Sequence, residues 1–226
     1  MKIKTLAVLA GVSAPLILHG SVSGEFVGIT TTSKPNPFGL LVVNVYANFD
    51  SPGEDHMVGV AGTPLSPLHI WVEGGVFYNH PFGSDLAPPG GFLEIFPSLA
   101  FDTFVTIGKK TSAGDATLIS PGFPELTGPS LWTVSAGWVV TPNNPQGNPF
   151  DAVNSFPGNG QVLIGQFSTA DGTGIGGTML LKIGPGGTQA YVSFFLPSPG
   201  TLAMMGMTGV AGLFGTRRRR PHRRGR

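Results

Sequence analysis

One short stretch decides the fold class, the segment Leu131-Trp132-Thr133-Val134-Ser135-Ala136-Gly137-Trp138-Val139. Its larger apolar residues recur at every second position. In an extended chain this places Trp132, Val134, Ala136 and Trp138 on one face and the small or polar residues on the other, as a half-buried β-strand requires. We therefore predict a strand here, with both tryptophans in the core.

Similar alternation recurs in short segments bounded by Gly, Pro, Asn and Asp, and no stretch has a convincing helical period. The predicted strands are 25–32, 40–49, 68–72, 76–78, 99–107, 131–140, 161–168, 178–183 and 189–195. The segment 99–107 has apolar residues on both faces, so we expect it in a central, buried position. About nine strands predict an all-β domain over residues 24–196, built as an antiparallel β-sandwich.

Composition agrees with one domain of this class. The 226 residues include 35 Gly and 21 Pro, which suits many turns, while 41% of the chain is hydrophobic and can form a core. There is no cysteine, which excludes a disulfide framework, a thiolate metal site and a cysteine nucleophile.

Charge is strongly segregated along the chain. All seven arginines lie between Arg217 and Arg226, whereas residues 24–196 contain four lysines and all twelve carboxylates, a formal charge of −8. An acidic domain of this kind makes nucleic acid an unlikely partner, and we predict none.

The N-terminus has the pattern of a signal peptide. Lys2 and Lys4 precede an apolar run from Thr5 to Leu18, and small residues follow at Ser21-Val22-Ser23. Gly11 and Pro15 interrupt the run and it lacks a polar face, which disfavours the alternative of a buried N-terminal helix. We predict that residues 1–23 are a signal helix that signal peptidase removes after Ser23.

The C-terminus combines a helix breaker, an apolar run and a basic end. Pro197, Ser198, Pro199 and Gly200 precede the uncharged run 201–215, and the basic end 216–226 opens with four arginines, Arg217, Arg218, Arg219 and Arg220. The run is short for a membrane span, yet it can cross with help from its flanks. Arginines directly after it favour a stop-transfer signal over contact with nucleic acid or anionic lipid, and they would remain in the cytoplasm.

In this order of elements, residues 197–226 resemble the PEP-CTERM sorting signal of exosortase-processed bacterial proteins. Pro197, Pro199 and Gly200 match the family motif and Ser198 replaces its usual glutamate, giving a Pro-Ser-Pro variant. The resemblance implies an exosortase-type transpeptidase as a partner, cleavage near the motif, and inner-membrane anchoring before processing. The segments 75–85 and 96–108 also resemble a module of uncharacterised secreted proteins from planctomycete-type bacteria, with no activity attached.

Patterns that could support a metal site or a nucleotide site are weak. The glycines of segment 172–177 resemble a phosphate loop, but a predicted strand follows where a nucleotide-binding loop requires a helix. Asp50, Glu54, Asp55 and His56 could hold calcium in a loop, although their spacing is not that of an EF-hand and a solvated turn is the simpler interpretation. His69 and His80 lack the paired spacing of metal ligands, so we predict no metal and no cofactor.

Catalytic patterns are also absent. No Gly-x-Ser-x-Gly elbow occurs, and Glu73, Glu94 and Glu125 could form a glycosidase pair only if the fold sets two of them at the required separation. We expect a noncatalytic protein of the cell surface, outer envelope or extracellular matrix that contacts exopolysaccharide or neighbouring proteins. The alternative is a secreted carbohydrate-binding module or small hydrolase, with a sugar platform of Trp71, Phe77 and Tyr78.

Overall fold

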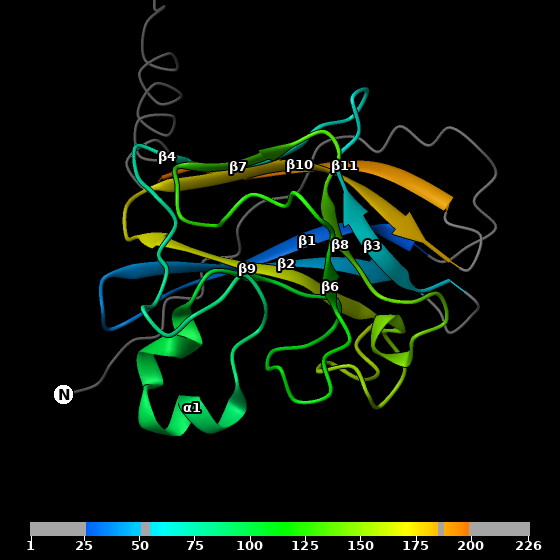
Figure 1. The fold of residues 1–226 in the computed structure, drawn as a ribbon, viewed down its shortest axis with the longest axis horizontal. Helices are drawn as coiled ribbons and strands as arrows, with labels where there is room; N and C mark the ends of the chain where they lie inside the picture. The colour runs from blue at the N-terminus through cyan, green and yellow to red at the C-terminus, as the bar shows by residue number, and fades with distance from the viewer. Residues whose placement is uncertain (1–25, 51–54, 185–187, 199–226) are drawn as a thin grey trace, which may run out of the picture.

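The computed structural model describes residues 26–50, 55–184 and 188–198, and nearly all of its regular structure is β. A four-stranded antiparallel sheet has the order β1-β2-β9-β5, and a seven-stranded antiparallel sheet contains the other strands (Figure 1). The strands of the first sheet are β1 (Phe26–Pro35), β2 (Leu40–Phe49), β9 (Gln161–Ala170) and β5 (Phe104–Val105).

The seven-stranded sheet has the order β6-β8-β3-β10-β4-β7, with β11 paired to the other edge of β10. Its strands are β3 (Met57–Ala61), β4 (Leu68–Glu73), β6 (Leu118–Ile119), β7 (Ser130–Thr133), β8 (Gly137–Val139), β10 (Gly174–Ile183) and β11 (Thr188–Leu196). β3 and β4 pair with successive halves of β10, and β8 and β7 pair with β3 and β4 in turn. β3 and β4 together therefore occupy the place of one long, interrupted strand beside β10, and β8 and β7 together occupy the next place.

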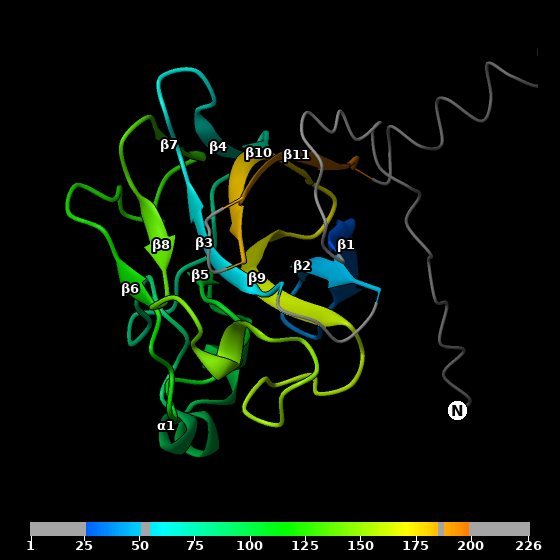
Figure 2. The same cartoon turned by 90° about the vertical axis from the view of Figure 1, so that its right-hand side faces the viewer.

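One level of the molecule contains β4, β7, β10 and β11, and another contains β1, β2 and β9 (Figure 1), while β3, β6 and β8 lie along the side between these levels (Figure 2). One hydrophobic cluster contains buried side chains of both sheets, including Val43 and Val45 from β2 and Ile70, Met179 and Leu181 from the other sheet. Alternate residues of these strands point into this cluster, so the period of two in the sequence reports the core correctly. The core therefore lies between the sheets.

Several predicted strands agree with the structure and others do not. The predictions 40–49 and 161–168 match β2 and β9, whereas 76–78 forms no strand and β3 and β6 were not expected. Within 99–107, the 3₁₀ helix η1 (Pro97–Phe101) replaces the first part and only β5 is extended. β5 is buried as predicted, but it occupies a sheet edge and not a central position.

The described residues contain three short helical segments, α1 (Gly90–Ile95), η1 and η2 (Pro145–Gly147). α1 lies outside the two sheets and buries none of its residues. Across residues 26–50, 55–184 and 188–198, no helix is long and apolar enough to span a membrane. The predicted signal helix with its cleavage site at Ser23, Pro199 and Gly200, the predicted span 201–215 and the arginine cluster lie outside the described residues.

The prediction that both Trp132 and Trp138 are core residues is half wrong. Trp138 is fully buried, and its ring packs edge-on against Phe123 with a centroid separation of 5.9 Å. Trp132 is 55% exposed. The hydroxyl of Thr133 accepts hydrogen bonds from the amides of Ser135 and Ala136, which folds a turn between β7 and β8. This turn breaks the alternation, because a local side-chain hydrogen bond competes with the regular ladder.

Candidate binding face

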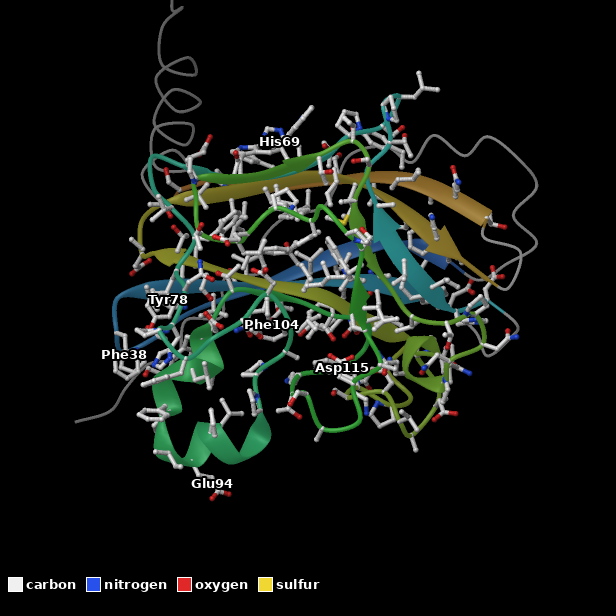
Figure 3. All side chains as sticks on the ribbon, viewed as in Figure 1. Phe38, His69, Tyr78, Glu94, Phe104 and Asp115 are labelled. Carbon is white, nitrogen blue, oxygen red and sulfur yellow. The ribbon has the colours of Figure 1, made fainter. Side chains whose placement is uncertain are left out.

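The outer surface of the seven-stranded sheet carries a group of aromatic rings. On β4, Leu68, Ile70 and Val72 are buried, while His69 and Trp71 between them are half-buried and point the other way. Figure 3 shows His69 on the side of the sheet that faces away from β1, β2 and β9. The alternation of β4 therefore aims two rings outward.

Strand register adds three more rings from other parts of the chain. Trp132 on β7 lies opposite His69, and Phe195 on β11 lies opposite Gly176, which in turn lies opposite Trp71. Tyr191 lies on the same face of β11, four residues before Phe195. We call His69, Trp71, Trp132, Tyr191 and Phe195 the aromatic face.

Gly176 lies between Trp71 and Phe195 at one end of this group and leaves room for these two rings. A Cβ placed there would lie 2.4 Å from Cζ2 of Trp71 and 3.0 Å from Cδ2 of Phe195, closer than side-chain carbons approach each other. Both rings therefore lie against the backbone of β10 at a position where any other residue would push them away. The ring centroids of His69 and Trp71 are 4.9 Å apart with a tilt of 39°.

The aromatic face is open and contains polar groups between the rings. Trp132, Tyr191 and Phe195 are each about half exposed, at 55%, 49% and 50%. Thr178 lies opposite both His69 and Ser193 on this face, so hydroxyl groups separate the aromatic rows. The surface combines flat apolar rings with hydroxyl groups, a composition typical of ligand-binding surfaces. The exposed Glu73, the next outward residue of β4 after Trp71, adds one carboxylate at its end.

Only one member of the platform predicted from sequence belongs to the aromatic face. Phe77 is 3% exposed and packs against Phe167 in the core, so it cannot contact a ligand. Tyr78 lies on another segment, where its amide donates to the carbonyl of Ser168 in β9. The sequence places Trp132, Tyr191 and Phe195 in predicted strands. It does not show that these strands lie beside β4, so their position near Trp71 becomes visible only in the fold.

Three other residues, His80, Ser98 and Asp102, have the side-chain types of a catalytic triad. Nε2 of His80 lies 3.1 Å from the hydroxyl of Ser98, and the carboxyl of Asp102 accepts a hydrogen bond of 2.7 Å from the His80 backbone amide. Nδ1 of His80 accepts a hydrogen bond from the amide of Phe82, so the ring proton belongs on Nε2. In this tautomer His80 donates to Ser98 and cannot take its proton, and Asp102 does not orient the ring as a triad aspartate does.

Asp102 is fully buried, and its Oδ2 atom makes no hydrogen bond of acceptable geometry within the described part of the chain. Burial raises the pKa of this carboxyl from 3.8 to about 6, and the nearby amides of His80, Thr103 and Ser84 act in the opposite direction. Burial also raises the pKa of Tyr78, and the negative charge of Asp102 adds to that shift. Asp102 is thus a buried acid whose charge state changes near neutral pH.

The other predicted candidates lie apart. Glu73 ends β4, Glu94 lies on α1 and Glu125 lies in the loop before β7, all exposed, and Figure 3 shows Glu94 at the opposite end of the molecule from His69. Nε2 of the buried His56 accepts a hydrogen bond from the amide of Asn143, and Glu54 lies outside the described residues. Over the described ranges, no group of three His, Asp or Glu side chains is placed to hold a metal ion.

As the sequence predicts, residues 178–183 form a strand and not a helix, but this strand already includes most of the glycines of segment 172–177. Gly174 begins β10, and Gly176 and Gly177 lie within it. Their role is packing, because the ring of Phe194 covers Gly177 on the core side just as Trp71 and Phe195 cover Gly176 on the outer side.

Comparison with known proteins adds no relative to this description. No protein-family model matches the chain, and neither a curated protein nor a solved structure matches it.

Proposed function

We propose that this chain is an exported bacterial surface protein whose β-sandwich domain, residues 24–196, binds a neutral polysaccharide through the aromatic face and has no catalytic role. The observation that carries the proposal is the set of outward rings on β4, β7 and β11 of one sheet, with Trp71 and Phe195 on either side of Gly176. The two levels of strands with a shared core support the sandwich description.

The chemistry of the aromatic face fits a sugar polymer. The C–H face of a sugar ring is slightly positive and packs on the negative face of an aromatic ring, while its hydroxyls need hydrogen-bonding partners at the edges. Trp71, Trp132 and Phe195 offer such rings and His69, Thr178 and Ser193 offer the partners. The formal charge of −8 over residues 24–196 disfavours an anionic polymer, so the proposed ligand is neutral.

Binding should depend on individual rings. Each of Trp71→Ala and Trp132→Ala should weaken binding about tenfold, because one ring removed from a stacked contact costs on the order of 1 kcal/mol plus its buried area. Affinity gel electrophoresis through neutral polysaccharides such as xylan, mannan and mixed-linkage glucan measures this, with Trp fluorescence as a second readout. The matched control is Phe38→Ala, which removes a ring that is 59% exposed on another part of the surface.

Two results would contradict the binding proposal. One is a wild-type protein that migrates equally with and without each polymer. The other is binding that Phe38→Ala weakens as much as Trp71→Ala does, which would show that any exposed ring suffices.

The proposed route to the surface rests on the two ends of the chain. Signal peptidase would remove residues 1–23, residues 201–215 would hold the protein in the inner membrane with Arg217 to Arg220 in the cytoplasm, and an exosortase-type enzyme would cleave near Pro197-Ser198-Pro199-Gly200. The mature protein would then belong to the cell surface, outer envelope or extracellular matrix.

Intact mass of the protein from its native host tests this route. We expect a mass without the first 23 residues and without the residues after about Pro199, in the surface or matrix fraction. A mass that retains Arg217 to Arg226 in the membrane fraction would instead indicate a permanent anchor and would remove the exosortase step.

A further inference from the structure

The two sheets together present several strand edges, and β11 is the edge strand whose own sequence contains no protective feature. An exposed edge offers unpaired amides and carbonyls to another strand, and proteins usually guard it with a short strand, a charge, a proline or a bulge. The edge strands β5 and β6 have two residues each and β7 has four. β1 contains a register shift at Gly28 and ends in Lys34 and Pro35.

β11 has none of these features. Its nine residues, TQAYVSFFL, contain no charge, no proline and no glycine, and they pair with β10 in unbroken register. Among the described residues, no strand pairs with its second edge, although part of β1 in the other sheet lies close to β11. By its composition this strand is built to be paired on both sides.

The sequence of β11 is complementary to itself. In an antiparallel pair of two β11 strands centred on Val192, residues equally distant from the centre lie opposite each other and face the same side. Phe194 then lies opposite Ala190, and Tyr191 opposite Ser193, so each large side chain meets a smaller one. Phe195 meets Gln189, Leu196 meets Thr188, and no like charges meet anywhere along the pair.

We propose that two copies of this chain pair through antiparallel β11 strands centred on Val192, which joins their seven-stranded sheets into one. A two-fold axis through Val192 makes the contact closed, so it gives a dimer and not a filament. The two aromatic faces then lie on the same side of a continuous sheet. The dimer is inferred from the edge strand β11 only, so it does not depend on the proposed binding of polysaccharide.

The absence of cysteine from the chain makes the register directly testable by cross-linking. Opposite residues of an antiparallel pair have Cα atoms about 4.5 or 5.5 Å apart, within the range of a disulfide. With protein purified from cells that express the full chain, Val192→Cys should therefore form a covalent dimer under mild oxidation. Thr188→Cys should remain monomeric on a denaturing gel, because its opposite residue is Leu196.

A second pair of variants keeps the test valid if Val192→Cys fails to fold, since Val192 is buried. Tyr191→Cys and Ser193→Cys place the thiol on the outer face. Mixed together, these two proteins should form a cross-linked heterodimer, because residue 191 of one copy lies opposite residue 193 of the other. Each protein alone should cross-link at least tenfold more slowly, because its two cysteines are then two positions out of register.

The oligomeric state gives an independent measurement. Sedimentation equilibrium should return twice the mass of the mature chain, and Ser193→Lys should raise the dissociation constant at least tenfold, because it brings two like charges close together across the pair. Leu118→Lys, a charge on an exposed position of β6 at the far edge of the same sheet, is the matched control and should leave the dimer intact. A monomeric wild-type protein, or equal cross-linking at 188 and 192, would overturn the dimer. A monomer that still binds polysaccharide would overturn the dimer alone and leave the proposed function standing.

Discussion

Trp138→Ala should lower the free energy of unfolding by about 3 to 5 kcal/mol, the usual cost of deleting a buried aromatic side chain. The Trp138 ring is fully buried, and its indole N–H donates a hydrogen bond of 3.1 Å to the carbonyl of Thr106. The substitution therefore opens a large cavity and leaves a buried carbonyl without this partner. Urea unfolding followed by circular dichroism measures the change.

The matched control comes from the same chain segment. Trp132→Ala removes the same side chain from a position that is 55% exposed, and it should change stability by no more than about 0.5 kcal/mol. Uninterrupted alternation from Leu131 to Val139 would place both rings in the core and make the two losses equal. Equal losses would therefore show that the turn at Thr133 is absent from the folded protein.

The second large effect concerns pH. Because burial raises the pKa of Asp102 to about 6 from 3.8, the unfolded chain releases this proton at lower pH than the folded chain does. Protonated Asp102 therefore makes its full contribution to the free energy of unfolding below about pH 3.8, and this contribution is lost as pH rises through 6. The loss amounts to at most about 3 kcal/mol from this group.

Asp102→Asn should remove this part of the pH dependence. The asparagine carbonyl can still accept the hydrogen bond from the His80 amide, and the variant cannot ionise. Denaturant unfolding of both proteins at pH 4 and pH 7 gives the difference, with Asp171→Asn in the exposed turn after β9 as a control for the loss of one carboxyl. Parallel pH profiles for wild type and Asp102→Asn would show that Asp102 is not the buried acid described here.

Much of the β structure could be predicted because strands with one buried face show the period of two directly. Val43 to Phe49 alternates between apolar residues and Asn or Tyr, and the predicted strand 40–49 matches β2. The period fails where a side chain makes its own turn, as Thr133 does between Trp132 and Trp138. It also fails in the segment 99–107, where η1 precedes β5 and burial on every side removes the alternation.

The candidate site was harder to predict than the strands. Trp71 is visible in the sequence as an aromatic residue in an alternating strand, but its partners depend on register between strands that are far apart in the chain. Gly176 lies opposite both Trp71 and Phe195, and no local pattern connects these three positions. Phe77 and Tyr78 were predicted as neighbours of Trp71, yet the chain turns after Glu73 and carries them away from the outer face.

The pairing of β2 with β9, and of β3 and β4 with β10, has a consequence for the order of folding. During synthesis, the first strands leave the ribosome long before their partners at 161–183 exist, and the β1–β2 hairpin alone is only marginally stable in water. Contacts between such distant segments also form slowly, because a large loop must close first. We therefore expect the nascent chain to stay open through most of its synthesis, which is the state that the export proposed above requires.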